Sequence, residues 1–313
     1  MECADLVSVV LITYNHEKFV GEAIESIIGQ KCPFKIELLI AEDCSTDNTR
    51  EVILKYADKY PDIIKVLKRK KNMGPTRNLY DAYTNCTGKY IAQLEGDDYW
   101  TDMKKLQKQY NFLERNKEYV CVTHLHENID SEGKKAVSGR WHGKAGRYTI
   151  EDFRKGEITI GHTGTFFFRN FLRANKEKYE ILYKAHDFIG DITLSLIILL
   201  QGPIFCMEDV MSIQRIVKTE NGTNWGSVRD KRDLEYETIE YSMNLLRWEK
   251  DYDYLTISGI NQMHKNIYLA LAYLKNHPGQ KSRELLKRAF EQDIKKMGII
   301  PFFIHMRMKK GRG

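Results

Sequence analysis

The stretch KYIAQLEGDDYW, residues 89–100, changes abruptly from apolar strand-forming residues to a cluster of acids. Its three carboxylates, Glu95, Asp97 and Asp98, repel one another and are costly to desolvate, so we expect a cation to compensate them. Mg²⁺ or Mn²⁺ is the expected cation, because such ions bind carboxylate oxygens and often complete their coordination with substrate phosphate. An acidic turn without a ligand is the alternative that this stretch alone leaves open.

Three similar apolar runs precede this stretch, and apolar residues at helical spacing follow each of them. The runs cover residues 7–12, 36–41 and 63–67. Continuous apolar runs are typical of strands buried on both faces, and their alternation with helices predicts an α/β fold with a mostly parallel sheet flanked by helices. Ligands bind at the carboxyl ends of such strands. Polar residues follow the first two runs at 13–16 and 42–43, so we expect them to share one site with the acids.

Composition limits the class of protein. The 313 residues are 42% hydrophobic and 29% charged, which fits one large soluble domain or two packed ones. The longest apolar runs are far shorter than the roughly 20 residues that a membrane-spanning helix needs. Glu2 and Asp5 stand where a signal peptide would carry basic residues, so we expect a cytoplasmic protein. The six cysteines form no CxxC pair, which argues against a zinc ribbon or a disulfide framework.

After about residue 110 the strand and helix pattern is less regular. A glycine-rich connection at residues 131–147 separates two further apolar strand candidates, at 119–123 and 165–168. Beyond Trp225, apolar residues return to helical spacing, for example over residues 260–274. This spacing predicts a helical C-terminal extension.

Taken together, these segments resemble family 2 glycosyltransferases, which are inverting enzymes of the GT-A fold, here of the bacterial surface-polysaccharide type. The resemblance covers about residues 6–226 and rests on the order and spacing of the strand-end motifs. It also includes EDVMSIQR at 208–215 and GTNW at 222–225. It implies a GT-A domain over residues 1–226, with a nucleotide-sugar half (1–110) and an acceptor half (111–226), followed by a helical extension over 227–313.

The resemblance implies a set of donor-binding residues at the strand ends. The loop after the first strand would wrap the nucleotide base, the acid after the second strand would pair with the base edge, and an arginine would meet the base or diphosphate. The acidic cluster would be the family's DxD motif, with Glu rather than Asp first, and would approach the ribose and metal. The implied donor residues are Thr13, Tyr14, Asn15, Asp43, Arg77, Glu95 and Asp97, and the implied metal ligands are Asp97 and Asp98.

Asp191 matches the family's late acid, the proposed catalytic base. Such a carboxylate takes a proton from an acceptor hydroxyl as its oxygen attacks the anomeric carbon opposite the departing nucleoside diphosphate. A single displacement of this kind inverts the anomeric centre. Asp187, one helical turn earlier, is the second candidate.

The sequence departs from the family at Val217, where many relatives carry a histidine two residues after the arginine that matches Arg215. We expect Lys218 to replace it by contacting diphosphate directly. His162 is a candidate for the acceptor pocket, with a hydrogen-bonded core histidine as the alternative. Further candidates for acceptor or diphosphate contacts are Asp187, Arg215 and Trp225.

The expected function is transfer of a sugar from a nucleotide sugar, most simply a UDP-sugar, to a glycan or lipid-linked acceptor. Residues 297–310 mix apolar bulk with cations, and we expect them to touch the inner membrane face. No nucleic acid partner is expected. A nucleotidyltransferase is one alternative, although residues 13–16 lack the glycine-rich basic loop that would hold a triphosphate. A non-catalytic nucleotide-sugar-binding module is the other, and the intact acids argue against it.

Overall fold

The computed structural model describes residues 5–136, 144–155, 160–174, 176–216, 231–252 and 258–297. Its contacts divide the chain into two compact units. The first contains residues 1–183 and 187–230, and the second contains residues 184–186 and 231–313. The predicted domain boundary at 226/227 falls between described segments, as do Val217, Lys218 and Trp225.

The first unit is built on a mixed sheet in the order β3-β2-β1-β4-β8-β6-β9-β5, with β7 paired to β9. Its first half is parallel, as predicted, because β1 pairs with both β2 and β4, and β2 pairs with β3. These four strands are β1 (Leu6–Thr13), β2 (Lys35–Glu42), β3 (Ile64–Lys68) and β4 (Tyr90–Glu95). The register places Thr13 opposite Glu42, and Ile12 opposite Glu95, so the polar strand ends lie at one edge.

The other half of the sheet mixes strand directions. β8 (Phe167–Arg169) runs antiparallel to both β4 and β6 (Cys121–Ile129), whereas β6 is parallel to β9 (Ile204–Arg215). The short strands β5 (Tyr99–Trp100) and β7 (Gly146–Tyr148) pair antiparallel with β9. β5 follows the acidic stretch directly, so its pairing with β9 fixes where that stretch leaves the sheet.

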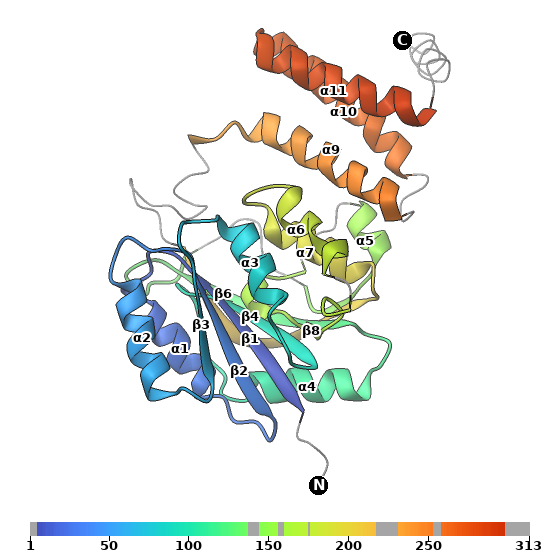
Figure 1. Cartoon of the computed structure of the whole chain (residues 1–313). Helices are drawn as coiled ribbons and strands as arrows, with labels where there is room; N and C mark the ends of the chain where they lie inside the picture. The colour runs from blue at the N-terminus through green and yellow to red at the C-terminus, as the bar shows by residue number, and fades with distance from the viewer. Residues whose placement is uncertain are drawn as a thin grey trace. The chain divides into compact units, whose positions relative to one another are not determined.

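Helices flank the sheet, as Figure 1 shows. Their bounds are α1 Val20–Ile28, α2 Thr49–Lys59, α3 Pro75–Tyr83, α4 Lys105–Arg115, α5 Ile150–Lys155, α6 Ile181–Lys184 and α7 Gly190–Leu199, with 3₁₀ turns η1 Thr163–Thr165 and η2 Glu177–Tyr179. Alternate residues of β1, β2 and β4 pack with α1, α2 and α4 in one apolar cluster. The predicted α/β sheet flanked by helices is confirmed.

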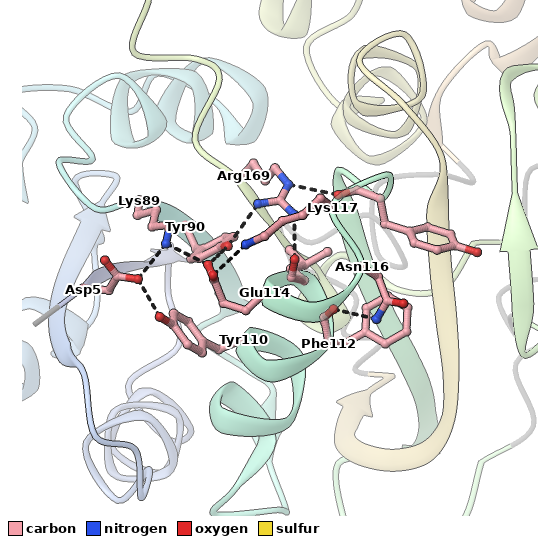
Figure 2. A network of polar contacts seen from close by, with 11 residues as sticks. Asp5, Lys89, Tyr90, Tyr110, Phe112, Glu114, Asn116, Lys117 and Arg169 are labelled. Atoms are coloured by element: carbon pink, nitrogen blue, oxygen red, sulfur yellow. Dashed lines mark hydrogen bonds and ion pairs between the residues drawn. The ribbon is translucent and has the colours of Figure 1, made fainter.

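A polar network braces the amino ends of β1 and β4 (Figure 2). Lys89 Nζ lies 2.7 Å from both Asp5 Oδ2 and Glu114 Oε1, and Tyr110 donates a 2.5 Å hydrogen bond to Asp5. Arg169 donates to Leu113 O and to the Tyr90 hydroxyl. Because this network lies at the amino ends of the strands, it stabilises the sheet away from the polar carboxyl ends.

The second unit is helical, as predicted for the C-terminal region. It contains α9 (Leu234–Tyr252), α10 (Ser258–Asn276) and α11 (Gln280–Met297). Their shared core consists of Ile239, Met243, Ile267, Ala270, Tyr273, Leu285 and Ala289. Within the described segments, none of the helices has the length and apolar character needed to cross a membrane.

Candidate functional site

The loop that follows β1 and the loop that follows β2 contact each other at the carboxyl ends of these strands. Asn15 and Cys44 both adopt left-handed backbone conformations, with φ of 57° and 61°, which asparagine tolerates better than most residues. The Asn15 amide donates to Ser45 Oγ at 3.1 Å, and its side-chain oxygen accepts the Thr46 amide at 2.8 Å. The two loops are therefore fixed to each other, with Thr13 buried and Tyr14 half-buried beside them.

Asp43 holds the loop that precedes α3. Its two carboxylate oxygens accept the backbone amides of Met73 at 2.8 Å and Gly74 at 2.9 Å. Burial raises the pKa of Asp43, while these two amides and the charge of Arg69 act to lower it. Each oxygen keeps a second lone pair, so Asp43 can also accept a hydrogen bond from a ligand N–H. Arg77 lies in the first turn of α3. Its Nε is 3.1 Å from Asp81 Oδ1, and its guanidinium stacks on Tyr183 with the guanidinium carbon 4.2 Å from the ring centroid.

Gly96 brings the acidic stretch directly against the end of β1. A Cβ atom at this position would lie 2.5 Å from Thr13 Oγ1 and 2.9 Å from His16 Nδ1, closer than real Cβ contacts allow. The Gly96 amide also donates to Ile12 O at 2.9 Å. The strand end therefore requires glycine, and the acids on either side of it lie next to the β1 loop.

Glu95 and Asp98 converge on His162. The imidazole Nε2 lies 3.5 Å from Glu95 Oε2 and 3.6 Å from Asp98 Oδ2. Burial acts to raise the pKa of Glu95, but the nearby His162 and hydrogen bonds from His162 and Thr163 bring it to about 2. Burial raises the pKa of Asp98 well above its usual value, and the charges of Asp97 and Glu95 raise it further. Burial acts to lower the pKa of His162, but Glu95 and Asp98 raise it to about 9.

Residues 95–98, which we call the acidic loop, also contact His16 and Arg215. Asp97 Oδ2 lies 3.7 Å from His16 Nε2. The Arg215 amide donates to Asp98 Oδ1 and its Nη1 donates to Asp97 O, both at 2.7 Å, and Nη2 pairs with Glu22. Its guanidinium also stacks on Tyr99, at 4.8 Å from the ring centroid. The structure therefore places Arg215, a candidate for diphosphate contact, as a brace of the acidic loop.

The turn that carries His162 is held from several elements. Trp100 Nε1 donates to Gly164 O at 3.0 Å, and Gln109 Nε2 donates to Thr165 O at 2.8 Å. Thr163 Oγ1 donates to Glu95 Oε1 at 2.8 Å. His162 was predicted as a candidate from the sequence, whereas Thr163 was not. The polar segment GHTGT at 161–165, ahead of an apolar strand, marks the turn but not its contact with Glu95.

Asp191 lies in the first turn of α7, where its Oδ1 accepts the Ile192 amide at 2.7 Å. Burial raises the pKa of Asp191, the Ile192 amide lowers it, and the charges of Glu95 and His162 act on it in opposite directions. Asp187, the second candidate base, accepts a hydrogen bond from Thr76 Oγ1 through its backbone oxygen, at 3.1 Å. The start of α7 therefore packs against the start of α3.

A comparison with models of known protein families identifies the family of this chain. The model of glycosyl transferase family 2 matches residues 8–174, more than half of the chain. The chain belongs to this family.

Two relatives from Bacillus subtilis illustrate the family match. The chain is 37% identical over 122 residues to the putative glycosyltransferase EpsE, covering 39% of this chain and 43% of EpsE. It is 34% identical over 108 residues to the putative teichuronic acid biosynthesis glycosyltransferase TuaG, covering 34% of this chain and 42% of TuaG. The chain thus spans less than half the length of the curated relatives it matches.

Solved structures share the fold at low sequence identity. TarS 1–349 of S. aureus, in complex with UDP-GlcNAc, is 18% identical with a TM-score of 0.56, and the match covers 92% of this chain and 88% of that one. The mannosyltransferase PcManGT from Pyrobaculum calidifontis, in complex with GDP-Man and Mn²⁺, is 15% identical with a TM-score of 0.50, covering 93% and 81%. The GT-A fold expected from the sequence is confirmed.

The acidic loop of this family 2 chain has a donor set that fits a divalent cation. Glu95, Asp98 and His162 each offer one ligand atom, and these atoms lie within 4.8 Å of one another. Asp98 Oδ2 is buried and has no hydrogen-bond partner among the described residues, which is costly unless a ligand compensates it. Asp97 is not part of this cluster, so its assignment as a metal ligand stays a prediction.

Proposed function

We propose that this family 2 chain is an inverting glycosyltransferase that moves a sugar from a nucleotide sugar, a UDP-sugar, to a hydroxyl of a glycan or lipid-linked acceptor. The observation that carries the proposal is the meeting of the carboxyl ends of β1, β2 and β4, where the acidic residues lie. Asp43 follows β2, and Glu95 and Asp98 end or follow β4. Asp191 lies in the first turn of α7, and the segment just before it bonds to Thr76 of α3 through Asp187 O. The carboxyl ends of the parallel strands thus offer a set of cation ligands, and Asp191 at the start of α7 is a separate carboxylate.

The donor half of the mechanism follows from the contacts of Asp43. A uracil presents an N–H beside two carbonyl oxygens, and the free lone pairs of Asp43 suit that N–H. The fixed loops that contain Tyr14 and Asn15 would enclose the base. When bound, a divalent cation held by Glu95 and Asp98 would neutralise charge on the leaving diphosphate. The UDP-GlcNAc and GDP-Man in the similar solved structures support a nucleotide sugar as donor.

The acceptor half depends on Asp191. Its carboxylate would take the proton of an acceptor hydroxyl while that oxygen forms a bond to the anomeric carbon, and the bond from that carbon to the diphosphate oxygen breaks. Burial raises the pKa of Asp191, which strengthens the carboxylate as a proton acceptor as long as it remains ionised. A single displacement then inverts the anomeric configuration.

A product assay tests the proposal. Nucleotide sugars are first screened by thermal shift with and without Mn²⁺, because a ligand that binds the native state raises its stability. Donors that bind are then incubated with glycan or lipid-linked acceptors, and release of nucleoside diphosphate is measured. UDP release that stops in an Asp191→Asn variant is the expected result. Pyrophosphate release would instead indicate a nucleotidyltransferase, and binding without any release would indicate a non-catalytic module.

Cell-surface polysaccharide synthesis is the proposed pathway, and the name of TuaG supports it. Its acceptors would place the enzyme on the cytoplasmic face of a membrane, where the cationic and apolar residues 297–310 would contact anionic lipid. Most of this segment lies outside the described residues. If a chain ending at residue 296 binds anionic vesicles as well as the full chain does, this part of the proposal is wrong.

A further inference from the structure

Glu95, Asp98 and His162 form the candidate metal site, and the ligand atom of His162 is a nitrogen. His162 Nε2 lies 3.5 Å from one carboxylate oxygen and 3.6 Å from another, at the long edge of hydrogen-bond range. Ligand atoms held about 2.1 Å from one ion lie between about 3.0 and 4.2 Å apart. Both distances fall in this range, and all three ligand atoms lie within 4.8 Å of one another, so the arrangement suits atoms that surround one ion.

Resting on the proposed function, we propose that His162 is a direct ligand of the divalent cation, and that its nitrogen makes the site prefer Mn²⁺ to Mg²⁺. Mg²⁺ favours oxygen ligands and keeps most of its water, whereas imidazole binds first-row transition metals more readily. The donor set of one nitrogen and two carboxylates therefore favours a transition metal. Asp97, whose carboxylate faces His16, lies outside this donor set.

Hydrogen bonds from several elements fix the turn that carries His162. Its imidazole is largely buried, Thr163 bonds to the neighbouring ligand Glu95, and Trp100 and Gln109 bond to backbone oxygens of the η1 turn. His162 Nδ1 accepts the Gly164 amide at 3.2 Å. Ligation through Nε2 leaves the ring proton on Nδ1, which then cannot accept the Gly164 amide, so this long contact would be given up when the metal binds. The rest of the turn is anchored through other atoms and need not move.

Mn²⁺ alone is the probe for the first test, which needs no donor or acceptor. The full chain is titrated with Mn²⁺ and the loss of the free-ion paramagnetic resonance signal gives the affinity. Pulsed electron paramagnetic resonance of the complex then reports whether a ¹⁴N nucleus is coordinated directly. The expected result is a bound Mn²⁺ with directly coordinated nitrogen. A bound Mn²⁺ without nitrogen, or no binding at all, would overturn the inference whether or not any variant folds.

Variants identify the nitrogen. His162→Asn should remove the ¹⁴N signal and weaken Mn²⁺ binding at least about tenfold, since even residues behind the ligands are worth that much. It should weaken Mg²⁺ binding, measured by competition, by a smaller factor. His16→Asn is the matched control, because His16 faces Asp97 in the same loop, and it should retain the nitrogen signal. Nitrogen coordination that survives in His162→Asn, or equal losses for both metals, would contradict the inference.

This outcome is separable from that of the proposed function. A chain that releases UDP from a donor while binding Mn²⁺ only through oxygen keeps its assignment as a transferase, and only the role of His162 fails. If instead the chain binds Mn²⁺ through nitrogen but releases no nucleoside diphosphate, the role of His162 stands and the proposed transferase function fails.

Discussion

Replacing Gly96 with alanine should damage the site through one methyl group. The added Cβ would lie 2.5 Å from Thr13 Oγ1 and 2.7 Å from Thr13 Cβ, whereas unstrained carbon contacts are about 3.5 to 4.0 Å. Thr13 is buried at the end of β1, and Gly96 is bonded to Ile12 O, so neither side can retreat freely. The end of β4 should therefore move away from β1 by about 1 Å, and the acids should move with it.

The expected loss of stability follows from overpacking. Forced insertion of a methyl group into a packed region costs about 1 to 3 kcal/mol. For a unit of this size, that lowers the melting temperature by about 2 to 12 °C. The same displacement should weaken Mn²⁺ and UDP binding, because ligand positions must hold to within about 0.5 Å.

Gly88→Ala is the matched control, since Gly88 precedes β4 at its other end. A Cβ there would lie 2.6 Å from Ser8 N and 2.7 Å from Leu6 O, an equally severe clash with β1. Both variants are compared by thermal unfolding and by Mn²⁺ and UDP titration at a temperature where each is folded. Both should lose stability, but only Gly96→Ala should lose binding. Equal binding in the two variants would refute the reasoning.

Three further changes test other parts of the molecule. Asp191→Asn should lower the transfer rate by about 10² to 10⁴ while leaving donor affinity unchanged, measured as UDP release and by titration. Glu37→Gln should flatten acid unfolding: burial acts to raise the Glu37 pKa, but bonds from Ser8, Lys65 and Thr87 bring it to about 2, so its contribution is present above about pH 4.5 and is lost toward pH 2. Arg215→Lys should weaken Mn²⁺ binding, because lysine cannot reproduce the planar contacts, and unchanged affinity would contradict that role.

The parallel half of the fold was predictable from sequence because its strands are buried on both faces. β1 and β2 are mostly apolar, with only Ser8 and Glu37 as polar residues inside the runs, so their pattern identifies them without knowledge of the partner strands. The polar residues that follow them then fall at one edge by topology alone, which is why Asp43 and the acids of residues 95–98 could be grouped in advance.

The contacts that residues within the site make with one another could not be predicted in the same way. β8 has only three residues, and the turn before it contacts Glu95 across 68 positions in sequence. Nothing in the local pattern of residues 161–165 indicates that partner. Arg215 was similarly a candidate for diphosphate contact, yet the pairing of β5 with β9 brings it onto the backbone of Asp97. Such contacts depend on tertiary register rather than on periodicity.

The acidic residues 95–98 therefore have neighbours on two sides. Gly96 lets the chain lie directly against β1. Asp97 then faces His16, whereas Glu95 and Asp98 face His162. Two carboxylates that share one imidazole and one desolvated space cannot both be ionised cheaply, and the pKa of Glu95 is lowered while that of Asp98 is raised. A divalent cation at this point would favour the ionised form of both. Metal binding should accordingly release a proton from the loop, which ties the metal affinity of the site to pH through the same residues that bind the metal.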